Sequence, residues 1–289
     1  MEPRRSPRSI TVFSHTRPED TEAALRRIVE LAAEVGVEVR LPRAEIEKFG
    51  LVPGAVEAPD ASAGDAATDL VIVLGGDGTI LTALRDFADT GVPVFAINYG
   101  AIGFLATVEP WELEDGIRLA LRGEYDVMEM PGLLAATSAG DRLAINDVSL
   151  HRRQSGRVAE LAYSVEGEEL GEVRCDGLVV ATPAGSTGYN LANGGPVLAW
   201  GVEGYVVSFI APHTLTARSL VVAPGDALDV TNRSRSDEVD VTTDGREICT
   251  LAPQATMSIR FEQRQSLLAQ APGATFYHRL RDKFGRLSY

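Results

Sequence analysis

The spacing of apolar residues divides the chain into two parts of different character. In the first part, short unbroken apolar runs alternate with stretches in which apolar residues recur at helical spacing. Unbroken runs of this length indicate strands buried on both faces, and their alternation with helices predicts an α/β domain with an open parallel sheet. The predicted strands are 9–14, 37–41, 70–74 and 93–97, and the predicted helices are 18–35, the stretch from 78 onward and 111–123. We assign residues 1–122 to this domain and predict a surface connection with one short helical turn for 42–68.

In the second part, apolar residues occur in short segments separated by glycines and charged pairs. Such close spacing is typical of antiparallel hairpins and predicts an all-β, sandwich-like domain over residues 123–263. The last stretch, 264–289, returns to helical spacing, with Phe276, Leu280 and Phe284 on one face. We expect this tail to pack back onto the first domain.

The strand predicted at 70–74 leads directly into the sequence GGDGT, residues 75–79. Gly75 and Gly76 permit a sharp turn and a close approach to the backbone. The helix that follows presents amide N–H groups and a positive dipole end to an anion. Asp77 would repel a bound phosphate, so its carboxylate has another role. It either caps the helix or takes part in the chemistry of the bound group.

The length of the chain and its cysteine content indicate its domain number and its cellular compartment. The chain has 289 residues, of which 45% are apolar, and this suits one large or two ordinary domains. No apolar run is long enough to span a bilayer. Two cysteines, Cys175 and Cys249, provide neither a disulfide framework nor zinc-type spacing. We therefore expect a protein of the reducing cytoplasm.

The net charge of −14 narrows the range of partners. An acidic surface is repelled by phosphate backbones and anionic lipids, so we expect neither nucleic acid nor a membrane as partner. Lys48 and Lys283 are the only lysines. An acid-rich, lysine-poor composition is also that of proteins adapted to a salty cytoplasm, and it suggests a haloarchaeal-type protein.

Four stretches together carry a family resemblance: GGDGT (75–79), NYGAIGF (98–104), IND (145–147) and CDGLVVATPAGSTGYNLANGGP (175–196). Because all four stretches occur in this order, the sequence closely resembles the NAD kinase family over most of its length. GGDGT alone is shared with 6-phosphofructokinases and with diacylglycerol and sphingosine kinases. The longer 175–196 stretch is much more specific.

The resemblance implies an enzyme that phosphorylates the 2′-hydroxyl of the adenosine ribose of NAD⁺ to give NADP⁺. Asp77 would be the general base, and Gly75, Gly76 and Thr79 would lie at the phosphates. The donor would be ATP, another nucleoside triphosphate or polyphosphate, and Mg²⁺ would arrive with it, since the sequence shows no metal-ligand cluster of its own. A carboxylate beside phosphate-binding amides suits the activation of a hydroxyl.

The same resemblance implies which residues bind NAD. Asn146 and Asp147 match a pair that holds adenine and ribose, and Arg174 and Asp176 match positions near the nicotinamide half. Phe104 either lies near the adenine or fills the core. The full set of matching positions is Gly78, Phe104, Asn146, Asp147, Arg174, Asp176, Thr187, Gly188, Tyr189, Asn190, Ala192 and Ala211.

The resemblance also implies a homodimer or homotetramer in which a neighbouring subunit contributes to the site. The sequence departs from the family pattern at Ala184, at 198–204 and at Arg246, and these departures bear on affinity and specificity. Two alternatives remain at this stage. One is a GGDGT-type lipid or sugar kinase, and the other is a non-catalytic NAD-sensing module.

Overall fold

The computed structural model describes residues 5–14, 17–50, 52–58, 67–101, 103–153 and 157–285, which form two units. Unit 1 comprises the chain up to Glu129 and from Ser266 onward, and unit 2 is Met130–Gln265. The sequence placed these boundaries at 122/123 and 263/264. The chain crosses between the units inside two strands, β6 (Asp126–Ala135) and β17 (Thr256–Gln270).

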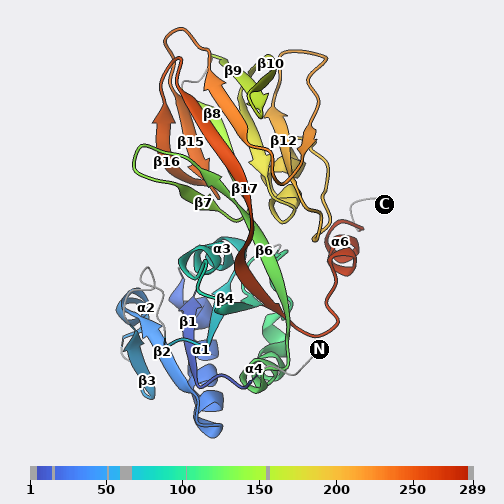
Figure 1. The fold of residues 1–289 in the computed structure, drawn as a ribbon. Coiled ribbons are helices and arrows are strands. Elements are labelled where there is room, and N and C mark those ends of the chain that lie inside the picture. Colours follow the sequence, from blue (N-terminus) through green and yellow to red (C-terminus); the bar gives the residue numbers. More distant parts are fainter. Residues whose placement is uncertain are drawn as a thin grey trace. The chain divides into compact units, whose positions relative to one another are not determined.

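Strands of unit 1 pair in parallel, in the order β3-β2-β1-β4-β5-β17. Figure 1 labels β1 to β4 of this sheet. The predicted open parallel sheet is therefore confirmed. Every residue of β4 and β5 is buried, as their unbroken apolar runs predict. The strands are β1 (Ser9–Ser14), β2 (Glu38–Pro42), β3 (Ala55–Ala58), β4 (Leu70–Gly75), β5 (Pro93–Asn98) and the end of β17.

The helices of unit 1 follow the predicted pattern for most of their length. They are α1 (Pro18–Glu34), α2 (Arg43–Phe49), α3 (Asp77–Asp86), the 3-10 turn η2 (Pro110–Glu112), α4 (Leu113–Arg122) and α6 (Phe276–Phe284). Apolar residues of α1 and α4 pack against the sheet in one continuous core, which includes Leu25, Ile28 and Ile117. Among the described residues, no helix has both the length and the apolar character needed to cross a bilayer.

Two local predictions in unit 1 were wrong. The short helical turn predicted within 42–68 corresponds to helix α2, but the connection also contains strand β3 and is not confined to the surface, because Ile46 and Phe49 pack against the core and Val52 is buried within it. Residues 59–66 lie outside the described residues. The segment 266–270 is strand rather than helix, since Leu267 to Ala269 pair in parallel with β5. Helical structure in the tail is confined to α6.

Unit 2 consists of two antiparallel sheets around a shared apolar core, as predicted. One contains β10-β9-β14-β17 with β6 and β7, and the other runs β13-β12-β11-β8-β15-β16. The remaining bounds are β7 (Arg142–Ala144), β8 (Asp147–Arg152), β9 (Ala159–Val165), β10 (Glu168–Cys175), β11 (Gly177–Ala181), η3 (Gly185–Thr187), α5 (Tyr189–Ala192), β12 (Tyr205–Ile210), β13 (Leu220–Val222), β14 (Leu228–Asn232), β15 (Val239–Thr243) and β16 (Arg246–Leu251).

Candidate functional site

The GGDGT turn lies at the carboxyl end of β4, where ligands bind in open α/β sheets. Gly75 is the last residue of the strand, and Gly76 caps α3 with an extended backbone. A second glycine turn meets it there, because a Cβ added to Gly100 would lie 2.6 Å from the Cα of Gly76. Gly78 is exposed, and a Cβ added to it would meet nothing within 4 Å. The turn is thus tightly packed on one side and open at Gly78.

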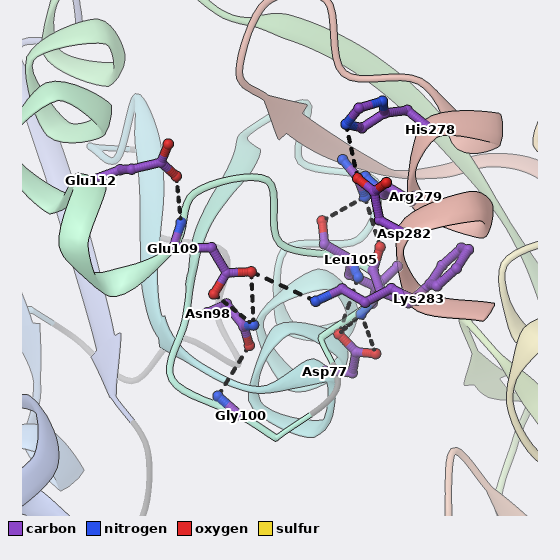
Figure 2. Close-up of polar contacts among 11 residues, drawn as sticks. Asp77, Asn98, Gly100, Leu105, Glu109, Glu112, His278, Arg279, Asp282 and Lys283 are labelled. Carbon is purple, nitrogen blue, oxygen red and sulfur yellow. Dashed lines mark hydrogen bonds and ion pairs between the residues drawn. The ribbon is translucent and has the colours of Figure 1, made fainter. Parts of the chain in front are cut away.

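The carboxylate of Asp77 does not cap its own helix. Oδ1 accepts hydrogen bonds from the backbone N–H groups of Phe104 (3.0 Å) and Leu105 (3.1 Å), and Oδ2 accepts from Phe104 at 2.9 Å (Figure 2). Each carboxylate oxygen offers two lone pairs. Oδ1 uses both in these bonds, while Oδ2 uses one and, among the residues that the structure describes, has no second donor. The orientation of Asp77 is therefore fixed by the 104–105 backbone.

Asn98 shapes the loop that supplies these amides. Its Oδ1 accepts the Gly100 N–H at 3.1 Å, and its Nδ2 donates to both oxygens of Glu109, at 3.3 and 3.1 Å (Figure 2). Lys283 of α6 lies 3.6 Å from the same Glu109 carboxylate. The sequence placed Asn98 in the 98–104 motif but gave it no role of its own, although it is the polar residue that ends the buried strand β5.

Helix α6 packs on this loop through aromatic rings and one arginine. The ring of Phe104 is buried, with ring centroids 5.9 Å from both Phe276 and Phe284. Arg279 is also buried, and its Nη1 donates to the carbonyl oxygens of Phe104 (2.7 Å) and Leu105 (3.1 Å). Burial lowers the pKa of Arg279 to about 10, and the charge of Asp77 acts in the opposite direction. The guanidinium is therefore cationic at neutral pH.

Sequence reasoning missed Arg279. Its signal was present, because residue 279 lies three positions after Phe276 and so shares the apolar face of the predicted tail helix. A charged residue on an apolar face needs a specific partner.

In unit 2, the IND turn is held by a residue nearly one hundred positions away. The Asp244 carboxylate accepts backbone N–H groups from Ile145 (3.1 Å), Asn146 (2.7 Å) and Asp147 (3.1 Å). Asp244 has a left-handed φ of 45° in the turn between β15 and β16. The sequence did not assign it a role. Its signal is the Asp-Gly pair of a tight hairpin.

The two predicted nucleoside-binding residues of this turn, Asn146 and Asp147, differ in their environments. Burial, with a smaller contribution from the Asp244 charge, raises the pKa of Asp147 from 3.8 to about 7. The side-chain oxygen of Asn146 is buried and accepts no hydrogen bond from any residue that the structure describes. A buried acceptor of this kind calls for a ligand donor, such as an amine.

The 182–190 turn packs directly against the IND turn. Thr182 donates its hydroxyl to Ile145 O at 2.7 Å and its N–H to Asn146 O at 2.9 Å. Gly185 sits so close that an added Cβ would lie 2.0 Å from Asn146 O. The predicted residue Asn190 is fully buried, with Nδ2 donating to Ser186 O and Pro196 O, both at 2.9 Å. Its amide therefore holds the turn together.

The remaining predicted residues of this turn lie at its surface. Gly188 and Ala192 are exposed, and Thr187 donates its hydroxyl to Ala184 O at 3.1 Å. Tyr189 stacks on His151, with ring centroids 5.6 Å apart and planes at 24°. Burial raises the pKa of Tyr189, and the charges of Asp147 and Asp176 add to the rise. The structure thus brings Tyr189 within electrostatic reach of both predicted carboxylates.

Arg174 and Asp176 belong to different ion pairs. Asp176 lies 3.0 Å from Arg152, whereas Arg174 lies 3.3 Å from Glu160. Arg174 also lines a cavity of about 650 Å³, together with His213. Ala211 is exposed and has a left-handed φ of 42°. Within the described part of the chain, no group of three or more His, Cys, Asp or Glu side chains is arranged to hold a metal ion.

Comparison with protein families gives two matches that follow the two units. Residues 55–125 match the model of the ATP-NAD kinase N-terminal domain, and residues 145–270 match the ATP-NAD kinase C-terminal domain. The chain is 36% identical to an NAD kinase of Gemmatimonas aurantiaca over 76% of this chain and 78% of the relative. It is 34% identical to an NAD kinase of Thermobifida fusca over 96% of this chain and 89% of the relative.

Two solved structures, of an NADH kinase and of an NAD kinase, have a similar fold. A yeast NADH kinase complexed with NADH matches with a TM-score of 0.84 at 22% identity, over 98% of this chain and 89% of that one. An NAD kinase from Archaeoglobus fulgidus in complex with ATP matches with a TM-score of 0.73 at 26% identity, over 96% of this chain and 98% of that one.

Proposed function

This chain belongs to the ATP-NAD kinase family and is an NAD⁺ kinase, and we propose which of its residues carry out each part of the reaction. Asp77 accepts the proton of the 2′-hydroxyl on the adenosine ribose of NAD⁺. The observation that carries this proposal is the fixed carboxylate of Asp77, whose Oδ2 keeps a lone pair for a further proton donor.

In the proposed reaction, the 2′-oxygen attacks the terminal phosphorus of the donor. A bond forms between that oxygen and phosphorus, the bond from phosphorus to the bridging oxygen of the donor breaks, and Asp77 holds the released proton. The open space at Gly78 admits the reacting groups, and the positive end of α3 favours the negative charge of the phosphates. The donor is ATP, another nucleoside triphosphate or polyphosphate, and it carries its Mg²⁺ as part of the substrate.

Unit 2 supplies the groups that recognise the nucleoside. The buried oxygen of Asn146 accepts from the exocyclic amine of adenine, and Asp147 binds ribose hydroxyls. Tyr189 and the exposed edge of its turn offer an aromatic face and backbone groups to the same substrate. Asn190 contributes by holding that turn in place.

The two alternatives fit these observations less well. A lipid or sugar kinase with a GGDGT turn does not explain the match of residues 145–270 to the NAD kinase C-terminal domain. A non-catalytic sensing module does not require a carboxylate oriented by two amides with one lone pair open.

Two further parts of the proposal concern the state of the protein. We place it in the cytoplasm, since both cysteines are free. We also propose a homodimer or homotetramer, and light scattering coupled to size-exclusion chromatography measures this directly. A monomer that is fully active at assay concentrations would contradict the oligomer.

The function is tested by a coupled assay in which an NADP⁺-specific dehydrogenase reports NADP⁺ formation. NAD⁺ is supplied with ATP, other nucleoside triphosphates or polyphosphate, each with and without Mg²⁺, and NADH is tested as an alternative acceptor. We expect NADP⁺ with at least one donor and a strict requirement for divalent metal. Absence of NADP⁺ with every donor would contradict the proposal.

A further inference from the structure

A single peptide group joins Arg279 to Asp77. The peptide between Phe104 and Leu105 has its carbonyl oxygen on Phe104 and its N–H on Leu105. That oxygen accepts from Arg279 Nη1 at 2.7 Å, and that N–H donates to Asp77 Oδ1 at 3.1 Å. Figure 2 shows Leu105 between the two charged side chains. The peptide is therefore hydrogen-bonded at one end to a cation and at the other to an anion.

We propose that Arg279 is a positioning residue for the phosphoryl transfer, acting on Asp77 through the Phe104–Leu105 peptide. The inference rests on the proposed role of Asp77 as general base. Arg279 does not touch the reacting groups in this account. It fixes the plane of the peptide whose N–H orients the base.

Polarisation strengthens the arrangement beyond simple packing. A carbonyl that accepts from a cation makes the N–H of the same peptide a better donor, since hydrogen bonds in a chain polarise one another. Both ends are charge-assisted, and such bonds are stronger than neutral ones. Nη1 of Arg279 also donates to Leu105 O at 3.1 Å, which restrains the next peptide as well. The cation thus holds two successive peptides of the loop.

Helix α6 holds Arg279 rigidly enough for this role. Arg279 is 7% exposed, and Phe276 on the same helix contacts the ring of Phe104. Lys283, one turn further on, lies 3.6 Å from Glu109, which binds Asn98 at the other end of the loop. Helix α6 therefore contacts this loop directly at Phe104 and Leu105, and indirectly at Asn98 through Glu109.

The same helix offers a matched control. Arg281 lies two residues after Arg279, its side chain is 70% exposed, and it lies 3.5 Å from Asp282. Methionine has nearly the same helix propensity as arginine, so Arg279→Met and Arg281→Met change the helix equally. Arg279→Gln also removes the charge but keeps a donor. Arg279→Lys keeps the charge and can donate to both carbonyls, since a single nitrogen makes both contacts in the native chain.

The test is the steady-state kinetics of these full-length variants, with circular dichroism and thermal unfolding to establish folding. We expect Arg279→Met to lower kcat by about 10- to 100-fold, as a displaced catalytic group does, with little change in KM for NAD⁺. Arg279→Lys recovers most of kcat, and Arg281→Met matches the native enzyme. If the methionine variant does not fold, Arg279→Gln replaces it in the comparison with Arg279→Lys.

Two results overturn the inference. One is a folded Arg279→Met or Arg279→Gln variant whose kcat equals that of Arg281→Met. The other is a lysine variant no more active than the glutamine variant. Asp77→Asn, measured in parallel, separates this failure from that of the proposed function. An active Asp77→Asn enzyme refutes the base itself, whereas an inactive one beside a fully active Arg279→Met refutes only the role of Arg279.

Discussion

The carboxylate of Asp244 accepts the backbone N–H of Asn146 at 2.7 Å, across 98 positions of sequence. The same carboxylate accepts the N–H groups of the residues on either side of Asn146. A charged acceptor on three successive amides fixes the conformation of the turn. Asn146 presents its buried side-chain oxygen from that turn, so the geometry of nucleoside recognition depends on Asp244.

Asp244→Asn is predicted to weaken both this turn and NAD⁺ binding. An amide has one acceptor oxygen instead of two, and its NH₂ group would face backbone donors. Loss of one charge-assisted bond costs about 1.5–3 kcal/mol of unfolding free energy. We expect a higher KM for NAD⁺ and a lower melting temperature. Asp89→Asn is the control, because Asp89 also has a left-handed backbone (φ 58°) but is exposed. Equal behaviour of the two variants would contradict this role.

The raised pKa of Asp147 predicts a pH-dependent stability. Its pKa rises from 3.8 to about 7 on folding, first through burial and then through the charge of Asp244. The folded state therefore holds this proton more tightly than the unfolded state. The resulting stabilisation is complete below about pH 4 and is lost as the pH rises through about 7.

Asp147→Asn removes this titration, so the variant gains stability relative to the native protein between pH 5 and pH 8. The gain is on the order of 2 kcal/mol. Thermal unfolding of both proteins without ligand across this range measures it. A difference in unfolding free energy that stays constant with pH would show that Asp147 does not titrate in this way.

The contact between the two glycine turns predicts an intolerance to alanine at Gly100. A Cβ there would lie 2.6 Å from the Cα of Gly76, and backbone atoms cannot move aside as a flexible side chain can. Overpacking of this kind costs about 1–3 kcal/mol, and it displaces the turn that carries Asp77. We expect lower kcat and lower melting temperature. Gly225→Ala is the control, since a Cβ at Gly225 meets nothing within 4 Å. A Gly100→Ala enzyme with native kcat would refute the argument.

The net charge of −14 predicts a dependence of stability on salt. Repulsion among surface acids destabilises the folded state, and salt screens it, with a Debye length of about 10 Å at 0.1 M and about 3 Å at 1 M. The melting temperature should rise as KCl is increased from 0.1 M to 2 M, and desalting should unfold part of the protein. Indifference to KCl would contradict salt adaptation.

Local pattern was sufficient to predict most of the fold. The strands at 70–74 and 93–97 are buried on both faces, and this burial produces the unbroken apolar runs from which they were predicted. The failures occurred where long-range contacts override local pattern. Residues 266–270 have helical spacing in the sequence, yet they pair with β5 because that edge of the parallel sheet is open to them.

The candidate site likewise contains residues that the sequence motifs identify and residues that only tertiary contacts reveal. Asp77 and the Asn146–Asp147 pair stand in glycine-rich or strand-end motifs that the sequence displays directly. Arg279 and Asp244 act on those residues through backbone groups 175 and 98 positions away, respectively. Local spacing marks Arg279 as a charge on an apolar helix face and Asp244 as part of an Asp-Gly turn, but it does not encode the tertiary contacts from which their roles arise.

If Asp77 is the base for phosphorylation of NAD⁺, the Asp77→Asn variant loses that base. The substitution keeps the size of the side chain and an acceptor oxygen but removes the negative charge. The measurement is kcat for NADP⁺ formation beside NAD⁺ affinity by calorimetry in the same preparation. We predict turnover lower by at least about 10²-fold, with NAD⁺ binding still measurable. Native turnover in the folded variant would contradict the account.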